Sequence, residues 1–382
     1  MKQKSSFLFS GKSLNSAMGN LPLRNNRGIA LIITLSVIAI LVTITFELNR
    51  QLQASVVNAA MVRDQAVISH MIASGVEIAE AMLIKDKAFF DMDTVQEDWA
   101  NPDKIAAYLS QVPFDAGEIG LYISDELARI QVNALVKFPE GREFNTPQRD
   151  LWFRFMALLL AQQESLEENA ALLEEIDDPS AIVNPIKDWL DSGDNDAITG
   201  LNGAENEYYK DLDPPYTARN GPLRNLEELI RIKGITPELF SAADAQVMGI
   251  SNYMTVHGIS KLNDKFTYAG KININTAELP VLAVLLPIGQ EFLATEIYNY
   301  RIETANGQFV YDLAGPTWYK EVPGCGDVDI DAELITTQSD IFRIECFAAL
   351  GDIRKTALVI VLREKNEESG KWYCKVLDWT HE

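Results

Sequence analysis

The hydrophobic pattern of the chain begins with an uninterrupted apolar run. Residues 29–46 carry no charged side chain, and a helix of about 20 apolar residues crosses the hydrocarbon core of a bilayer. From Glu47 to about Lys85 the pattern becomes amphipathic, and no proline interrupts it. We therefore predict a nearly continuous helix whose first part is a membrane anchor and whose second part packs against a protein core. Two separate helices that meet near Arg50 are the alternative.

Beyond this helix, strand-like and helical patterns alternate. Residues 120–124 and 128–133 have the pattern of two short antiparallel strands around Asp125 and Glu126. Helical periodicity follows over residues 148–177, 223–239, 278–286 and 291–302. Three strand-like segments close the chain, at residues 342–350, 356–363 and 372–379. Strands on both sides of a helical block indicate an insertion into one α+β domain.

The charges around the apolar run predict its orientation. Five basic residues and no acidic residue precede it, namely Lys2, Lys4, Lys12, Arg24 and Arg27. Because positive charge stays on the cytoplasmic side, we expect a single-pass inner-membrane protein with a cytoplasmic N-terminus and a periplasmic main domain. The formal net charge of −22 argues against nucleic-acid binding, since phosphates need clustered lysine and arginine.

Catalytic motifs are missing from the sequence. It contains no GxSxG and no glycine-rich phosphate loop, and its three histidines are scattered, so we predict that the protein is not an enzyme. Residues 223–239 and 272–302 resemble helix-hairpin-helix or SAM-like pairs, but few basic residues accompany them, which favours packing over DNA contact. One disulfide among Cys325, Cys346 and Cys374 is possible, and the sequence does not choose the pair.

An acidic, glycine- and asparagine-rich loop is a candidate metal site. Calcium prefers six to eight oxygen ligands, including carboxylates and backbone carbonyls. A spacing like that of an EF-hand starts at Asp194, but Ile198 and Thr199 occupy positions that need an acid or asparagine and then glycine. We therefore predict an irregular structural calcium loop, with an ordinary solvated turn as the alternative. The candidate ligands are Asp191, which could instead cap a helix end, Asp194, Asp196 and Glu205.

A candidate cleavage site lies between Gly28 and Ile29. An ordinary secretory signal is cut beyond its apolar core, whereas a cut after Gly28 removes the basic leader and leaves the anchor on the mature chain. This arrangement resembles the leader of type IV pilins and pseudopilins, which a prepilin peptidase cuts after glycine. A simple signal anchor is the alternative. Met18 is an alternative start that shortens the leader without changing the argument.

Several motifs, taken in order, resemble one family, the minor pseudopilin K family of the type II secretion system. Together they extend over nearly the whole chain. They are Arg27-Gly-Ile-Ala-Leu31, Ala128-Arg-Ile-Gln-Val-Asn-Ala-Leu135, Asp188-Trp-Leu-Asp191, Gly203-Ala-Glu205, Glu207-Tyr-Tyr209, Pro214-Pro-Tyr216, Asn225-Leu-Glu-Glu-Leu229, Ile232-Lys-Gly234, Ile272-Asn-Ile-Asn-Thr-Ala277 and Ser339-Asp-Ile-Phe342.

The resemblance implies a non-enzymatic subunit at the tip of the periplasmic pseudopilus. Such a subunit assembles with other minor pseudopilins, of the I, J and H types, and with the pseudopilus shaft. It initiates or caps the filament and supports the export of folded proteins. The resemblance also implies methylation of Ile29 after cleavage and calcium in the acidic loop. Most pilins carry glutamate at the fifth mature position, whereas this chain has Ile33 there, and the K family also lacks glutamate at this position. This absence suits a cap, since a buried unpaired carboxylate is costly.

The expected fold is α+β, with a type IV pilin-like long N-terminal helix, an antiparallel sheet and a large inserted all-α domain. The expected boundaries are residues 1–28 for the leader, 29–46 for the membrane-spanning part, 47–140 for the pseudopilin helix and first strands, 141–335 for the inserted domain and 336–382 for the last strands. The main alternative function is a signal-anchored periplasmic enzyme or receptor that does not polymerise. A DNA-uptake pilin is a further alternative, which the acidic charge opposes.

Overall fold

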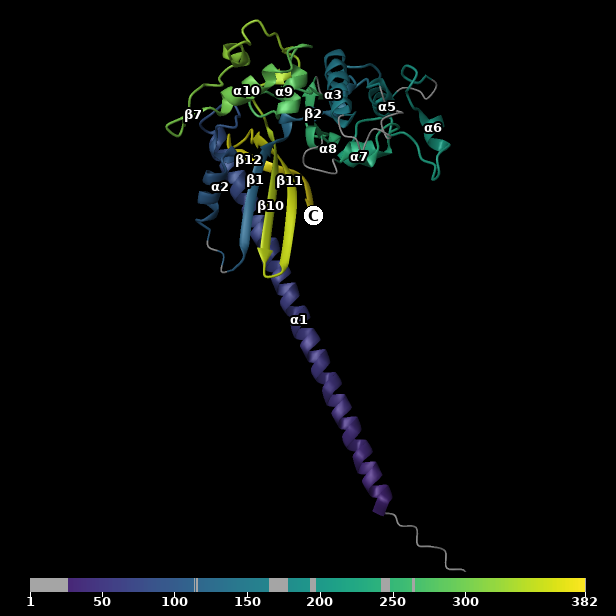
Figure 1. Cartoon of the computed structure of the whole chain (residues 1–382). Helices are drawn as coiled ribbons and strands as arrows, with labels where there is room; N and C mark the ends of the chain where they lie inside the picture. Colours follow the sequence, from purple (N-terminus) through teal and green to yellow (C-terminus); the bar gives the residue numbers. More distant parts are fainter. Residues whose placement is uncertain are drawn as a thin grey trace, which may run out of the picture. The chain divides into compact units, whose positions relative to one another are not determined.

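The computed structural model describes residues 27–112, 114, 116–164, 178–192, 197–241, 248–262 and 265–381. The chain divides into two compact units, one that ends at Arg63 and one that runs from Asp64 to Glu382. Figure 1 gives the order of the helices and strands along the chain.

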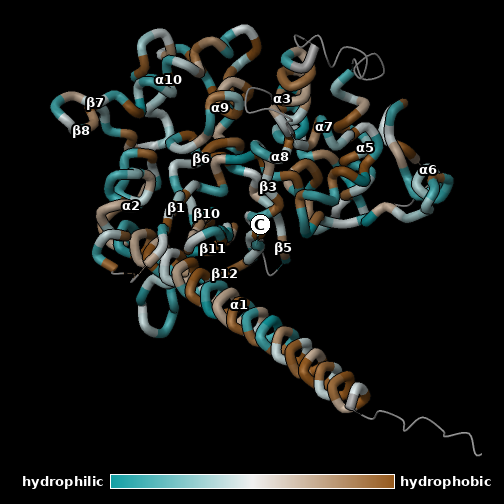
Figure 2. Tube along the Cα trace, turned by 60° about the horizontal axis from the view of Figure 1, so that its bottom comes forward, coloured by the Kyte–Doolittle hydropathy of each residue, from teal (hydrophilic) through white to brown (hydrophobic). Residues whose placement is uncertain are grey.

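The predicted long helix is confirmed as the single helix α1 (Arg27–Lys87), so the alternative of two helices meeting near Arg50 is wrong. In the first unit its apolar side chains are exposed, and Figure 2 shows this part of α1 largely in the brown of hydrophobic residues. The hydroxyl groups of Thr34, Thr43 and Thr45 donate to carbonyl oxygens one turn earlier in the helix, so these polar groups need no water. Within the described residues, α1 alone is long and apolar enough to cross a membrane.

The second unit contains a four-stranded antiparallel sheet in the order β1-β10-β11-β12. Its strands are β1 (Glu118–Asp125), β10 (Ile341–Leu350), β11 (Ile353–Lys365) and β12 (Trp372–His381). The three strands predicted for the end of the chain are therefore confirmed. One face of the sheet packs against the last turns of α1, where Ile68, Ile72 and Ala79 meet Ile344 and Val359 in a hydrophobic core.

The predicted strand pair around Asp125 and Glu126 is wrong. β1 pairs with β10 instead, and the chain then forms the 3₁₀ helices η2 (Glu126–Ala128) and η3 (Val132–Leu135) on either side of β2 (Ile130–Gln131). β2 pairs in parallel with β3 (Met254–Thr255). The local cause is the Asp125 carboxylate, which accepts the N–H of Leu127 at 2.8 Å and so begins a helical turn where a hairpin was expected.

Short helices and two-stranded pairs make up the rest of the unit. The predicted helices near residues 278–286 and 291–302 are confirmed as α9 (Leu279–Leu285) and α10 (Leu293–Ile302), whereas the pair predicted at 223–239 is reduced to η4 (Leu226–Arg231) and α7 (Pro237–Phe240). The predicted segment 165–177 lies outside the described residues. The helices are η1 (Asp98–Ala100), α2 (Pro102–Leu109), α3 (Thr146–Glu164), α5 (Ser180–Leu190), α6 (Asn206–Lys210), η4 (Leu226–Arg231), α7 (Pro237–Phe240), α8 (Ile250–Tyr253), α9 (Leu279–Leu285), α10 (Leu293–Ile302) and η5 (Trp318–Glu321).

Three further strand pairs accompany these helices. They are β4 (Ile259–Leu262) with β5 (Lys265–Tyr268), β6 (Ile272–Asn273) with β9 (Ile335–Thr336), and β7 (Thr304–Ala305) with β8 (Gln308–Phe309). A second hydrophobic core, formed by residues between Ile130 and Ile335, holds this part together. The boundaries expected at residues 141 and 335 stay predictions.

The Ile-Asn-Ile-Asn segment joins the helical part to the sheet. The Asn273 side chain donates to the Asp93 carbonyl at 2.9 Å and to the Asp125 carboxylate at 2.8 Å, and the Thr276 hydroxyl also donates to Asp125. Asn275 accepts the indole N–H of Trp318 at 2.6 Å. These buried polar side chains are therefore structural, because each makes hydrogen bonds that tie distant segments together.

Candidate functional site

Three buried carboxylates come together where α5 ends and α6 begins. Asp188 lies in the last turn of α5, Asp191 follows that helix, and Glu205 directly precedes α6. One oxygen atom from each lies within 4.8 Å of the others. Two predicted ligands, Asp191 and Glu205, are thus brought together, whereas Asp194 and Asp196 lie outside the described residues.

Asp188 is the member of this acidic cluster that the sequence prediction missed. Its carboxylate accepts the N–H groups of Thr199, at 3.0 and 3.2 Å, and of Ala204, at 3.0 Å. The spacing of three residues, which brings Asp188 near Asp191 where α5 ends, is a signal that could have found it. Asp188 therefore contributes a carboxylate to the cluster and also holds the part of the loop that contains Thr199 and Ala204.

Glu205 is the member that lacks partners. Both of its carboxylate oxygens are buried, and neither has a hydrogen-bond partner in the described part of the chain. Burial raises its pKa to about 7, and the negative charges of Asp188 and Asp191 add to this effect. Burial also raises the pKa of Asp188. Buried polar groups normally find a partner, so the two orphaned carboxylate oxygens of Glu205 are candidate ligands for a cation.

One ammonium group partly offsets the negative charge of the cluster. The Lys187 Nζ lies 3.8 Å from Asp188 and forms an ion pair with Asp191. One positive charge stands against three carboxylates, and it does not reach Glu205 in any described contact. Carboxylate oxygens are the ligands that calcium prefers, and the residues present therefore fit a calcium ion.

The surrounding side chains hold this site in place. Trp189 packs edge-on against Tyr209 with ring centroids 5.0 Å apart, and Tyr209 stacks on Tyr216. The Lys233 ammonium donates to the Asn202 carbonyl at 3.3 Å. Aromatic packing of this kind fixes the two chain segments that carry the carboxylates.

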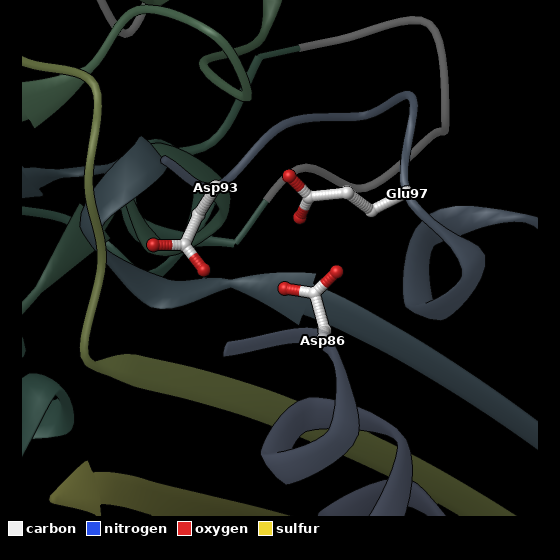
Figure 3. Close-up of side chains that lie close together, drawn as sticks. All are labelled: Asp86, Asp93 and Glu97. Carbon is white, nitrogen blue, oxygen red and sulfur yellow. The ribbon is translucent and has the colours of Figure 1, made fainter. Parts of the chain in front are cut away.

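A second acidic cluster, Asp86, Asp93 and Glu97, has its own cations. Figure 3 shows Asp86 on α1 and the other two on the segment that follows, with the carboxylates pointing toward one another. The buried Arg363 guanidinium forms ion pairs with Asp93 and, at 3.6 Å, with Asp86, and the Lys87 ammonium lies 3.5 Å from Asp93. We interpret this cluster as an internal ion-pair network rather than a metal site, since protein cations already occupy it.

The candidate processing site lies at the start of α1. Gly28 is exposed, and a Cβ atom built on it would meet nothing within 4 Å. Ile29 is 49% exposed and Ile33 is 57% exposed. The residues on both sides of the predicted cut are therefore accessible.

The long apolar-then-amphipathic helix packed on an antiparallel sheet is typical of pilin-like proteins, and comparisons with known proteins show which of them the chain resembles. Residues 128–248 match the family described as type II secretion system protein K. Type II secretion system protein K of Pseudomonas aeruginosa is 26% identical over 69% of both chains. The protein of that name from Aeromonas hydrophila is 21% identical over 90% of this chain and 95% of its own.

A solved structure has a similar fold. The fold matches a chain in the complex of the pseudopilins K, I and J of enterotoxigenic Escherichia coli, with a TM-score of 0.55 and 15% identity over 85% of this chain and 99% of that chain. The resemblance to the K family is thereby confirmed. The chain is a minor pseudopilin of type II secretion and not an enzyme. Its single N-terminal apolar helix fits a signal-anchored, single-pass protein.

Proposed function

We propose that this pseudopilin acts at the tip of the pseudopilus, where it initiates or caps the filament with other minor pseudopilins and supports the export of folded proteins. The observation that carries the proposal is the large helical part, residues 126–336, inserted between strands β1 and β10 of the sheet. So large an insertion limits the addition of a further subunit above it. The solved complex of K, I and J supports partners of the I and J types. An H-type partner and the pseudopilus shaft are further partners that the resemblance to the family implies.

The topology we propose has the N-terminus in the cytoplasm and the second unit in the periplasm, because basic residues precede α1. Prepilin peptidase would cut between Gly28 and Ile29, and the new N-terminus would be methylated. The mature helix would stay in the inner membrane until assembly. Because residue 33 is isoleucine, this helix has no carboxylate there to neutralise the N-terminus of a neighbouring subunit. This suits a subunit above which no further subunit is added.

Replacing Gly28 tests this proposal. Gly28→Ala should abolish leader removal and secretion, because the peptidase requires glycine while the added methyl group meets no other atom. Gly221→Ala, at another glycine with open space around it, is the matched control. The mass of the N-terminal peptide and the level of an exported protein in the medium are the measurements. Normal processing and secretion by G28A would contradict the prepilin proposal, and an uncut chain that is active alone would favour a signal-anchored enzyme or receptor.

We also propose that Asp188, Asp191 and Glu205 hold a structural calcium ion, to which Asp194 and Asp196 would add ligands. A dication would satisfy the buried oxygens of Glu205 and offset the repulsion among the carboxylates. Its role would be to fix the loop between α5 and α6. The chemistry it supplies is electrostatic, with no part in any reaction.

The calcium proposal is tested by thermal unfolding with calcium and with a chelator. A ligand at a hundredfold excess over its Kd stabilises the native state by about 2.7 kcal/mol. We expect a stabilisation of this order for the full chain and its loss in Glu205→Gln. Glu207→Gln, an exposed position two residues away, should behave as the parent chain does. Equal melting temperatures with calcium and chelator would reject the site.

A further inference from the structure

A second place in the molecule is built to receive a ligand. A cavity of about 470 Å³ lies where β1, α8, the start of α9 and α10 meet, all within the second unit. Three tyrosines, Tyr122, Tyr253 and Tyr298, line it together with the side chains of Pro280 and Val281. A cavity of this size with mostly aromatic and apolar walls is typical of small-ligand sites.

A buried arginine supplies the polar part of this cavity. Arg301, on α10, lines the cavity and is only 2% exposed. Its guanidinium carries five N–H donors, and the described contacts account for one, from Nη1 to the Ile274 carbonyl at 3.1 Å. Its buried Nε has no hydrogen-bond partner in the described residues. The buried hydroxyl of Ser124, on β1 in the cavity wall, also lacks a partner there.

The charge of Arg301 is not neutralised by a neighbouring carboxylate. No described carboxylate lies within 4.0 Å of its guanidinium, although Asp125, Glu278 and Arg129 also line the cavity. Burial lowers the pKa of Arg301 to about 10, against the weaker attraction of Tyr298 and Glu278. A buried cation without a partner costs several kcal/mol, so the site is electrostatically incomplete.

Two of the three other charged groups in the cavity wall are engaged elsewhere, and the third, Glu278, attracts Arg301 from beyond ion-pair distance. The Asp125 carboxylate accepts hydrogen bonds from Asn273, Thr276 and the N–H of Leu127. The Arg129 guanidinium pairs with Glu126 at 3.2 Å. Arg129 thus has a carboxylate partner, whereas Arg301 has none at ion-pair distance within the described chain.

A purely structural role accounts for only part of this arrangement. Arg301 holds the Ile274 carbonyl and packs over the Tyr298 ring, with its Cζ atom 4.7 Å from the ring centroid. Neither contact needs the remaining donors or an unpaired hydroxyl on Ser124. Both features are explained if an anion enters the cavity, since a guanidinium binds a carboxylate through two parallel hydrogen bonds.

We propose that this cavity binds a carboxylate carried on an aromatic or apolar body, with Arg301 as its cationic partner. The carboxylate meets the guanidinium, and the tyrosines with Pro280 and Val281 cover the apolar body. Two sources share this chemistry, a free small carboxylate and the C-terminus of a polypeptide that ends in an aromatic residue. The proposal does not depend on the position of the protein in the pseudopilus.

The test uses the full chain in detergent and two matched small molecules. Benzoate carries the carboxylate, and benzamide has the same ring without the charge. Titration followed by saturation-transfer NMR should give benzoate an affinity at least about tenfold higher than that of benzamide, a difference of about 1.4 kcal/mol. Equal binding of the two molecules by the parent chain would overturn the proposal, whatever the variants do.

Variants assign the preference to the cavity. Arg301→Met should abolish the preference for benzoate, and Arg149→Met, at an exposed arginine on α3, should keep it. Tyr122→Ala, at a half-exposed wall residue, should weaken both molecules alike, which keeps the test open if R301M does not fold. A preference that survives in R301M would show binding elsewhere and would overturn the proposal.

Peptides distinguish the two sources. Gly-Gly-Phe with a free C-terminus and its amidated form are titrated in the same way. If the peptide with the free C-terminus binds more tightly than benzoate, the site is assigned to a polypeptide terminus; if it binds more weakly, the site is assigned to a small carboxylate. Both results support a carboxylate site. If the free and the amidated peptide bind equally, and both bind more tightly than benzoate, the site does not recognise the carboxylate and the proposal fails.

Discussion

At the scale of single residues, Gly203 controls the geometry of the acidic cluster. A Cβ atom at this position would lie 2.2 Å from the Asp188 carboxylate and 2.6 Å from the Thr199 nitrogen. The loop can therefore approach Asp188 closely enough for its N–H groups to bind the carboxylate only because residue 203 has no side chain.

Gly203→Ala should accordingly disturb the loop and the calcium site together. Overpacking of this kind costs about 1–3 kcal/mol, and the calcium-dependent part of the stability should shrink as well. Thermal unfolding with calcium and with chelator measures both effects, and Gly221→Ala, which meets no atom within 4 Å, is the control. If G203A melted as the parent chain does in both conditions, the close approach would not matter.

The candidate ligands show how far sequence reasoning extends at this scale. Asp191 and Glu205 were predicted from the density of acids in the loop, and the structure groups them. Glu205 was found through its spacing from Asp194, whereas in the structure its carboxylate lies within 4.8 Å of that of Asp188. Asp188 was missed because it sits on a helix outside the loop, and its role depends on how α5 packs. Local spacing cannot reveal a contact that tertiary packing creates.

At the scale of elements, the packing of α1 on the sheet depends on a small residue. Gly75 lies on the helix face toward the sheet, where a Cβ atom would be 2.6 Å from Cys346 Sγ and 3.0 Å from the Ile119 side chain. All three cysteines are free in the structure, and Cys346 is buried at this contact. The close contact between α1 and β10 is therefore made by Gly75 on the helix and the Cys346 thiol on the strand.

A double-mutant cycle tests this contact. Gly75→Ala gains about 1 kcal/mol of helix propensity but overpacks the interface, which costs about 1–3 kcal/mol, so we expect a net loss of stability. Cys346→Ala should relieve the overlap, and the double variant should be more stable than the sum of the single effects by about 1 kcal/mol. Urea unfolding measures all four proteins. Additive effects would contradict the proposed contact.

Elements with strong local patterns were the easiest to predict. The long helix and the last three strands follow from periodicity over many residues. The pairing of β1 with β10 was missed because its partner lies more than two hundred residues away in the chain, and alternation identifies a strand without identifying its neighbour. The 3₁₀ turn at Glu126 was missed because it depends on the Asp125 side chain.

At the scale of the whole second unit, Arg363 connects segments from both ends of the chain. Its guanidinium donates to the Leu83 carbonyl of α1 at 3.0 Å, to the Ser339 carbonyl at 2.9 Å and to the Asp93 carboxylate. The Asp93 carboxylate in turn accepts the N–H of Ser339 at 2.9 Å. No local pattern predicts such a network, since each member is an ordinary polar residue until the fold buries it.

Two carboxyl groups of this network should link folding to pH. Burial, with the nearby Asp93 charge, raises the pKa of Asp86 to about 6, and burial, with the Asp86 charge, raises the pKa of Glu97 to about 8. Their unfolded values lie near 4. Between about pH 4 and 8 these two groups therefore bind more protons in the folded protein than in the unfolded chain, and their contribution to stability falls as the pH rises through this range. The nearby cations Lys87 and Arg363 oppose the shift without removing it.

Glu97→Gln should flatten this pH dependence, because glutamine keeps the shape of the protonated acid and can still accept the indole N–H of Trp99. We expect E97Q to match the parent chain at pH 5 and to exceed its stability at pH 8 by on the order of 1–3 kcal/mol, since each unit of pKa difference corresponds to about 1.4 kcal/mol. Asp98→Asn removes the same charge at the exposed neighbouring position, so it controls for net charge. Urea unfolding at both pH values, with chelator present, measures the difference. A parent chain that is equally stable at pH 5 and pH 8, or a D98N chain that gains as much as E97Q, would show that the buried pair is ionised in the folded state.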